Sequence, residues 1–340
     1  VNQVGGNDEL IFDGGSLAVD AQGNVLASLP LFKPAIAVVD LESSKVAEIE
    51  EPTDIEQLES ALVLGIKDYF DKQGLPPRAV LGLSGGIDSA VTAHLAVKAL
   101  GAERVLGLLM PSRFSSEHSV SDAEDLGKAL CIETRTVAIE PIFNAYLASF
   151  RDLFGEQSDY GLAQQNIQSR IRGALVMGVA NYEGRLALAT GNKSELSMGY
   201  CTLYGDMIGG LAVLGDVFKN EVYALARHAN ATALAQGKEA PIPTSSIEKP
   251  PSAELAPNQQ DSDELPPYEV LDTVLRQAVI ENKLEKDIVA PASASPDAVQ
   301  SILTRLDRNE FKRRQGPISL RVSEKAFGIG RRIPIVQRYR

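Results

Sequence analysis

The sequence predicts an α/β protein, built on a doubly wound parallel sheet with a small β-rich N-terminal remnant. Short apolar runs alternate with helix-patterned segments from about residue 79 to residue 228. This alternation is typical of an open parallel sheet with helices on both faces. In addition, a glycine turn at residues 84–86 joins the first apolar run to the helix that follows it, a common position for a ligand loop.

The elements can be placed along the chain from these patterns. Pro52-Thr53-Asp54 begins an amphipathic helix that ends near Gly74. The predicted elements then run in this order: strand 79–83, helix 89–100, strand 104–110, helix 119–130, strand 134–140, a short helix to 150, helix 161–182, strand 185–189 and helix 216–228. Residues 241–267 are rich in Pro, Ser, Glu and Gln and predict a long loop, either a lid or disordered. Helices resume at 267–281 and at about 296–307.

The first 48 residues have a different pattern. Residues 10–12, 16–20 and 25–29 predict strands, and residues 21–24 predict a hairpin turn. Strands without helices cannot bury both faces, and the chain begins at Val1, so we expect residues 1–48 to be the tail of a domain and 49–340 to form a second one. Residues 40–54 predict an acidic linker between them.

Composition excludes several classes of protein. The net charge of −12 argues against a general nucleic-acid binder, although residues 305–340 carry 11 Lys and Arg against 3 Asp and Glu. No apolar run approaches the ~20 residues needed to span a bilayer, so we expect no membrane partner. Cys131 and Cys201 have no metal-site spacing, which favours a reducing cytoplasm.

The segment from Gly82 to Ser89 predicts a phosphate-binding loop. The first backbone N–H groups of a helix lack internal partners, and glycines let the backbone approach an anion. Ser84 and Ser89 add hydroxyl donors. Asp88 would repel a phosphate unless a cation lay between them, so it predicts Mg²⁺. The alternative is a simple turn in which Asp88 or Ser89 caps the helix.

A second turn has the same character. Thr190-Gly191-Asn192-Lys193-Ser194-Glu195 follows the predicted strand 185–189. Ligands of open α/β sheets collect at the carboxyl ends of the strands, where the strand order reverses. If strands 79–83 and 185–189 flank that point, the two turns open on one crevice.

Several blocks now carry a resemblance to one family. They are Ser84-Gly85-Gly86-Ile87-Asp88-Ser89, residues 165–173 (QNIQSRIRG), residues 190–195 (TGNKSE), Tyr204-Gly205-Asp206, residues 249–255 (KPPSAEL) and residues 311–314 (FKRR). Residues 52–340 resemble the synthetase domain of glutamine-dependent NAD synthetases, which implies an adenine nucleotide α-hydrolase-like fold. Residues 1–48 resemble the last part of that family's nitrilase-like glutaminase domain, through residues 2–6 and 12–16.

The resemblance implies a reaction. The carboxylate of deamido-NAD attacks the α-phosphate of ATP, pyrophosphate leaves, and ammonia converts the adenylate to NAD and AMP. No protein nucleophile is needed for these steps. The family's glutaminase uses a Glu-Lys-Cys triad that would lie upstream of Val1, so we expect this chain to use free ammonia rather than glutamine. The family also implies a homodimer or larger homo-oligomer.

The resemblance implies roles for individual residues. Those expected to bind ATP are Gly82, Leu83, Ser84, Gly85, Gly86, Ile87, Asp88, Ser89, Arg113, Thr190, Lys219 and Ser252. Those expected to bind deamido-NAD are Asn166, Arg170, Glu195 and Lys312, and those expected to hold Mg²⁺ are Asp88 and Glu195.

Simpler interpretations stay open for several of these side chains. Lys219 could be a solvated helix lysine, Arg113 a surface arginine, and Arg170 part of a helix-surface salt bridge. Arg313 and Arg314 compete with Lys312 as the residue that reaches the substrate.

Two other functions also fit the loop. One is another adenylating ATP pyrophosphatase, such as a GMP synthetase, an asparagine synthetase or a tRNA-thiolating enzyme. The other is a nucleotide-binding module without catalysis, against which Asp88, Glu195 and Lys219 argue.

Overall fold

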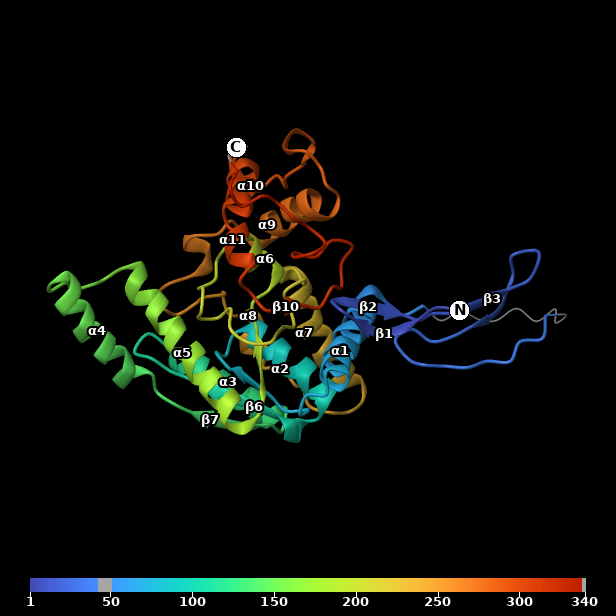
Figure 1. The fold of residues 1–340 in the computed structure, drawn as a ribbon, viewed down its shortest axis with the longest axis horizontal. Helices are drawn as coiled ribbons and strands as arrows, with labels where there is room; N and C mark the ends of the chain where they lie inside the picture. The colour runs from blue at the N-terminus through green and yellow to red at the C-terminus, as the bar shows by residue number, and fades with distance from the viewer. Residues whose placement is uncertain (42–50, 338–340) are drawn as a thin grey trace.

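The protein is built on a six-stranded sheet in which every neighbouring pair is parallel (Figure 1). The computed structural model describes residues 1–41 and 51–337, so most of the predicted acidic linker lies outside the described residues. The strand order is β10-β9-β8-β5-β6-β7. The strands are β5 (Ala79–Gly82), β6 (Val105–Leu109), β7 (Glu133–Thr136), β8 (Leu186–Ala189), β9 (Leu211–Ala212) and β10 (Ile318–Ser319). The predicted parallel sheet is confirmed.

Helices connect and cover these strands. They are α1 (Asp54–Gln73), α2 (Ile87–Leu100), α3 (Glu117–Ala129), α4 (Glu140–Phe154), α5 (Leu162–Glu183), α6 (Lys193–Met198), α7 (Lys219–Ala235), α8 (Thr244–Glu248), α9 (Tyr268–Leu275), α10 (Ala298–Arg308) and α11 (Glu310–Arg313). A π-helical turn, Arg276–Ile280, continues α9.

Strand β5 shows why the sheet needs helices on both faces. Its side chains alternate, so Ala79 and Leu81 join the core formed with α1, α2 and α7, while Val80 joins the core formed with α4 and α5. All three side chains are fully buried. The predicted doubly wound arrangement follows from this two-sided burial.

The strand order reverses beside β5. The chain runs from β5 to β6 and β7 on one side, then returns to place β8 against the other side of β5. The turns after β5 and β8 therefore open at the same edge of the sheet, as predicted for strands 79–83 and 185–189.

A third core lies against α6, which begins in the turn after β8. It combines α6 with α9 and α10 and contains Phe218, Leu271 and Ile302. Helices α9, α10 and α11 gather at the top of Figure 1, next to α6. The C-terminal part of the chain thus packs on the turn that follows β8.

The N-terminal segment forms two antiparallel strand pairs, β1 (Val4–Asn7) with β2 (Leu10–Asp13) and β3 (Leu17–Val19) with β4 (Val25–Ser28). The predicted hairpin turn is confirmed, because Asp20 N donates to Asn24 O at 3.0 Å. Strand β1 was not predicted, since Gly5 and Gly6 interrupt its apolar alternation. The β1–β2 pair packs on α1, while β3 projects away from the body (Figure 1).

The structure corrects some predicted element boundaries. The strand predicted at 134–140 ends at Thr136, and the helix predicted at 216–228 begins at Lys219 and extends to Ala235. Helix α7 begins later than predicted because Asp216 pairs with the buried Lys193 and Phe218 takes the N-cap position. The predicted loop 241–267 contains α8 and a 3₁₀ turn, Asp261–Asp263.

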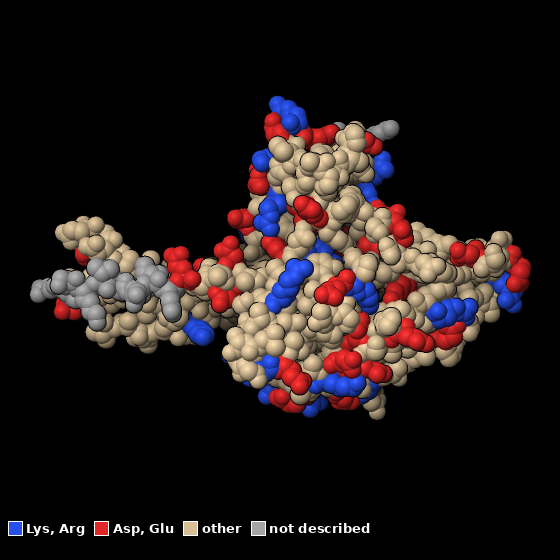
Figure 2. All heavy atoms as spheres, turned by 180° about the vertical axis from the view of Figure 1, so that it is seen from behind, with Lys and Arg blue, Asp and Glu red and all other residues tan. Residues whose placement is uncertain are grey.

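Charge on the described surface is mixed. Acidic and basic side chains are interspersed on the face in Figure 2. Within the basic C-terminal stretch, Arg313 is buried and pairs with Glu310 at 3.0 Å, so part of this charge is internal. Among the helices of residues 1–41 and 51–337, none combines the length and apolarity that a bilayer crossing requires.

Candidate functional site

The loop after β5 has the geometry of an anion cradle. Gly86 is the N-cap of α2, and the Gly86 N–H donates to Ser84 Oγ at 3.2 Å. Gly85 has a φ of +76°, and a Cβ there would collide with the carbonyl oxygen of Ser119 on α3, so only glycine fits. The capping alternative is wrong: Ser89 Oγ donates to Gly86 O at 3.0 Å, and no side chain caps α2.

Asp88 points away from its own helix, toward the turn after β8. Its Oδ1 accepts a hydrogen bond from Asn192 Nδ2 at 2.8 Å, and its Oδ2 accepts one from Lys219 Nζ at 2.5 Å. Lys219 Nζ also lies 3.3 Å from Glu195 Oε1. The cluster thus joins α2, α6 and α7, three elements more than 20 residues apart in sequence.

Lys219 is not a solvated helix lysine, because its side chain is only 2% exposed. Burial alone would lower the pKa of Lys219, but the charges of Asp88 and Glu195 outweigh this effect and raise it. Burial, and then the neighbouring charge of Asp88, raise the pKa of Glu195. Two carboxyl groups thus share one ammonium, and the raised pKa of Glu195 shows that a second negative charge beside Lys219 is unfavourable without a further cation.

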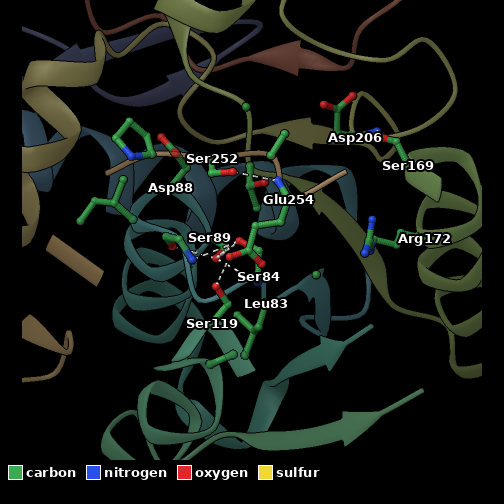
Figure 3. A pocket seen from close by; sticks show the side chains of 18 of the residues that line it. Leu83, Ser84, Asp88, Ser89, Ser119, Ser169, Arg172, Asp206, Ser252 and Glu254 are labelled. Atoms are coloured by element: carbon green, nitrogen blue, oxygen red, sulfur yellow. Dashed lines mark hydrogen bonds between the residues drawn. The ribbon is translucent and has the colours of Figure 1, made fainter. Parts of the chain in front are cut away.

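A cavity of about 300 Å³ opens over this cluster (Figure 3). Most of the predicted ATP-binding residues line it. Those are Gly82, Leu83, Ser84, Gly86, Ile87, Asp88, Ser89, Thr190, Lys219 and Ser252, together with Glu195 from the predicted metal and deamido-NAD sets.

Arg113 lies outside the cavity wall. It pairs with Glu140 and donates to Asn144 Oδ1 at 2.6 Å, and its side chain is 47% exposed. Its guanidinium also lies over the ring of Phe143. In this structure the side chain of Arg113 contacts residues of α4, and its contact with ATP stays a prediction.

Three residues predicted to bind deamido-NAD converge on one segment, residues 199–203. Asn166 Oδ1 accepts from Thr202 Oγ1 at 2.9 Å, and Arg170 Nε donates to Leu203 O at 3.2 Å. Lys312 Nζ donates to the carbonyls of Gly199 and Cys201 at 2.7 and 2.9 Å. Arg170 thus bonds a backbone carbonyl here, rather than the carboxylate of a helix-surface salt bridge.

Cys201, within this segment, lines a second cavity of about 610 Å³, whereas Asn166, Arg170 and Lys312 line neither of the two cavities. This cavity shares Ala189, Gly191, Glu195 and Asp206 with the first one, so the two meet at the turn after β8. Burial raises the pKa of Asp206 to about 6. These four shared residues form a rim between the two adjoining cavities, and Glu195 and Asp206 make it polar.

Sequence reasoning missed several charged residues that line the first cavity. Arg172 faces it from α5 (Figure 3), donates from Nε to Met110 O at 3.0 Å, and has its pKa lowered to about 10 by burial. Lys249, Glu254 and Asp261 come from residues 241–267, the segment predicted as a long loop. Arg172, Lys249 and Glu254 lie inside blocks that carried the family resemblance, which was the available signal.

The site also contains two carboxyl groups of the kind that bind hard cations. Asp88 and Glu195 approach the same point, the ammonium of Lys219, and carboxylate oxygens suit Mg²⁺. Within the described residues, no group of three or more His, Cys, Asp or Glu side chains is placed to hold a metal ion. A Mg²⁺ ion held by Asp88 and Glu195 would therefore need further oxygen ligands, and phosphate oxygens could supply them.

Comparison with known proteins gives the family. A family model described as NAD synthase matches residues 58–316. The glutamine-dependent NAD(+) synthetase of Synechocystis sp. is 48% identical over 346 residues, which cover 100% of this chain and 60% of that protein. The enzyme of the same name from Acinetobacter baylyi is 40% identical, with 100% and 62% coverage. The chain therefore spans about three fifths of the length of these curated relatives.

Solved structures agree in fold. A glutamine-dependent NAD+ synthetase from Acinetobacter baumannii, in complex with ADP, is 38% identical with a TM-score of 0.66, over 98% of this chain and 61% of that one. An NMN synthetase from Francisella tularensis is 28% identical with a TM-score of 0.63, over 76% of this chain and 95% of that one. The resemblance seen in the sequence blocks is confirmed, and the chain belongs to the NAD synthase family.

Proposed function

We propose that this chain catalyses the ATP-dependent amidation of deamido-NAD to NAD. The observation that carries the proposal is the cluster of Asp88, Lys219 and Glu195 beside a glycine cradle, inside a cavity at the reversal of strand order. Relatives of the same family are named NAD synthetases, and one was solved with ADP. A site rich in turns and charges suits a reaction that needs alignment and charge neutralisation.

The reaction has two steps. A carboxylate oxygen of deamido-NAD attacks the α-phosphorus of ATP, and the bond from that phosphorus to the bridging oxygen breaks, so pyrophosphate leaves. The ammonia nitrogen then attacks the carbonyl carbon of the adenylate. The bond from this carbon to the oxygen that bridges it to phosphorus breaks, so AMP leaves with that oxygen, and the nitrogen loses a proton. Adenylation is needed because oxide cannot leave from a carboxylate, whereas AMP can leave from the acyl-adenylate.

In this proposal the cradle holds the leaving group. Backbone N–H groups of residues 84–87 and the hydroxyls of Ser84 and Ser89 bind the β- and γ-phosphates, and Lys219 neutralises charge beside them. Thr190 and Ser252 contact ATP from the other walls of the cavity. Arg113 reaches ATP only if it exchanges its present partner, Glu140.

We assign the second substrate to the other side of the rim. Asn166, Arg170 and Lys312 all contact the segment 199–203, next to the larger cavity. Glu195 lines both cavities and would face both substrates. This arrangement would present the nicotinate carboxylate to the α-phosphate across one rim.

Asp88 and Glu195 would hold Mg²⁺. When bound, the ion supplies positive charge that offsets the charge of the phosphates. The proposal is supported by the contacts of both carboxyl groups with one ammonium and by the raised pKa of Glu195, because a further cation would favour its charged form.

We further propose self-association and a cytoplasmic location, without nucleic-acid or membrane partners. Self-association is supported by apolar side chains that are more than 40% exposed along α4 and at the start of α5. They are Tyr146, Leu153, Phe154 and Leu162. Light scattering coupled to size-exclusion chromatography tests this: a monomer at micromolar concentration would contradict it.

The test of the main proposal is an assay of AMP and NAD with ATP, Mg²⁺ and deamido-NAD, using ammonium or glutamine as nitrogen source. Neither cysteine lies in residues 1–48, so we expect turnover of the 340-residue chain with ammonium and none with glutamine. AMP formation without dependence on deamido-NAD would favour another adenylating enzyme. No AMP at all would favour a binding module.

A second candidate substrate follows from the Francisella neighbour, an NMN synthetase, to which this chain aligns over 95% of that chain. The carboxylate analogue of NMN should therefore be assayed in parallel. We expect the dinucleotide to give the higher kcat/KM, because its second nucleotide half can make contacts in the larger cavity that a mononucleotide lacks.

A further inference from the structure

A carboxylate from the lid segment stands inside the phosphate cavity. Glu254 Oε1 accepts hydrogen bonds from Ser119 Oγ at 2.5 Å and from Ser116 Oγ at 2.9 Å. Glu254 Oε2 accepts one from the Ser116 N–H at 3.3 Å. Figure 3 shows Glu254 reaching down toward Ser119 and Ser84, in the middle of the space that the cradle faces.

The groups around Glu254 are of the kinds that bind anions. Ser116 is the N-cap of α3, so its N–H and the first turn of this helix favour negative charge. Lys249 Nζ donates to Ser119 Oγ at 2.7 Å, and Arg172 faces the same cavity and is stabilised in its charged form by Glu254. Glu254 thus occupies a position that two hydroxyls, a helix start and two cations make suitable for an anion.

This anion position adjoins the glycine cradle directly. The carbonyl of Ser119 touches Gly85 so closely that no side chain could be placed there. Ser84, Ser89, Ser119 and Glu254 line one cavity. A polyphosphate in the cradle would therefore lie next to the carboxylate of Glu254, and like charges at such separations repel.

The backbone conformation that places the Glu254 side chain here is strained. Glu254 has a φ of +48°, in the left-handed region that residues with a Cβ rarely adopt. Its N–H donates to Ser252 Oγ at 3.1 Å, and Ser252 Oγ donates to Gln259 O at 2.5 Å, so the turn is closed on itself. Strain of this kind persists only where surrounding contacts hold it, so loss of the bonds to Ser116 and Ser119 would favour release of the segment.

We propose that Glu254 is an internal competitor of phosphate: it fills the anion position at the start of α3 in the nucleotide-free chain and leaves when the phosphates of the nucleotide enter. Opening of the segment 249–255 is then part of nucleotide binding. The inference rests on the proposed function, in that it takes the cradle to bind the phosphates of ATP.

The test compares Glu254→Gln with a matched control, Glu248→Gln, by calorimetric titration with pyrophosphate in the presence of Mg²⁺. Both variants lose one negative charge, but Glu248 is exposed at the end of α8. We expect Glu254→Gln to bind pyrophosphate about fivefold more tightly than the unaltered chain, since a nearby like charge costs on the order of 1 kcal/mol, which is a factor of about five. Glu248→Gln should bind as the unaltered chain does.

Salt provides a second measurement on the same samples. The gain in Glu254→Gln should shrink as salt rises to about 1 M, because screening removes the repulsion that the variant relieves. A gain that persists in high salt would overturn the electrostatic competition, as would equal or weaker binding in Glu254→Gln. Failure of the unaltered chain to bind pyrophosphate would instead overturn the phosphate cradle, and this inference with it.

Discussion

The ammonium of Lys219 lies 2.5 Å from Oδ2 of Asp88, which ties the start of α7 to the start of α2 across the reversal of strand order. The lysine side chain is 2% exposed and the aspartate 18%, so this is a buried bridge with one open end toward the cavity. A buried ion pair adds little net stability, because desolvation offsets its attraction. A role toward a charged ligand explains the pair better than stability does.

Asp88→Asn should abolish the reaction while leaving the fold cooperative. Asparagine replaces one of the two carboxylate oxygens with an NH2 donor, so either Asn192 or Lys219 would face a donor instead of an acceptor. The substitution also removes a charge that a cation on the phosphates would need. We expect AMP formation to fall by about 100-fold or more, the usual effect of removing a preorganised charge at such a site. The measurement is AMP release with saturating ammonium.

The control for this variant is Asp125→Asn, an exposed aspartate that pairs with Lys128 on α3. It should keep full activity. Thermal unfolding of both variants should remain a single transition. AMP release by Asp88→Asn within a few-fold of the unaltered chain would show that this carboxylate does not serve the phosphates.

Lys219→Met should lose both activity and stability. Without the ammonium, Asp88 and Glu195 face each other with no cation between them. Removing one partner of a buried ionic group costs about 3–5 kcal/mol, so urea unfolding should shift by that amount. Added Mg²⁺ should restore part of the loss, since the ion can take the place of the missing charge; no effect of Mg²⁺ would contradict the proposed metal position.

The fold could be predicted from the sequence because its signals are local. Residues 79–83 and 185–189 are short apolar runs followed by glycine turns, and each turn leads into a helix. β9 and β10 have two residues each and carry no periodic pattern, so they were missed. Their pairing depends on the sheet edge offered by β8, which is a tertiary effect.

The site was predictable only in part, for a similar reason. Asp88, Lys219 and Glu195 could be named from motifs, but the burial of Lys219 follows from three elements meeting in space. Glu254 bonds Ser119 across 135 residues, and nothing in the local sequence indicates that contact. Long-range contacts of this kind need the folded chain.

Lys193→Met should destabilise the C-terminal part of the chain. Lys193 Nζ lies 2.6 Å from Asp216 Oδ1, and both side chains are fully buried. Lys193 also donates to Ser323 Oγ and to the carbonyl of Lys325, at 2.9 Å each, so it ties the turn after β8 to the segment after β10. Loss of the ammonium leaves Asp216 charged and buried, and we expect a cost of about 3–5 kcal/mol in urea unfolding.

The matched control is Lys128→Met, which breaks the pair with Asp125 between side chains that are 72% and 62% exposed. Exposed pairs contribute about 0–1 kcal/mol, so this variant should unfold close to the unaltered chain. Equal shifts in the two variants would mean that the burial of Lys193 does not determine its contribution.

Glu59 should make stability depend on pH in the acid range. It lies between α1, α2 and α7, 2.7 Å from Lys98 Nζ and 3.3 and 3.6 Å from Nε2 of His94 and His228. Burial alone would raise the pKa of Glu59, but hydrogen bonds from His94 and Lys98 outweigh it and lower the pKa to about 2. A carboxylate with a lowered pKa stabilises the fold above its unfolded pKa of 4.5, and that stability is lost as pH falls toward 2.

Glu59→Gln should therefore unfold at a lower urea concentration than the unaltered chain. We expect its free energy of unfolding to be lower by roughly 2–3 kcal/mol at about pH 6. The difference should hold down to about pH 4.5 and shrink below it, because the unaltered chain then begins to lose the charge that glutamine lacks. Glu285→Gln, at an exposed glutamate, serves as the control and should follow the unaltered chain at every pH. A difference between Glu59→Gln and the unaltered chain that stayed constant down to about pH 2 would show that the charge of Glu59 does not determine it.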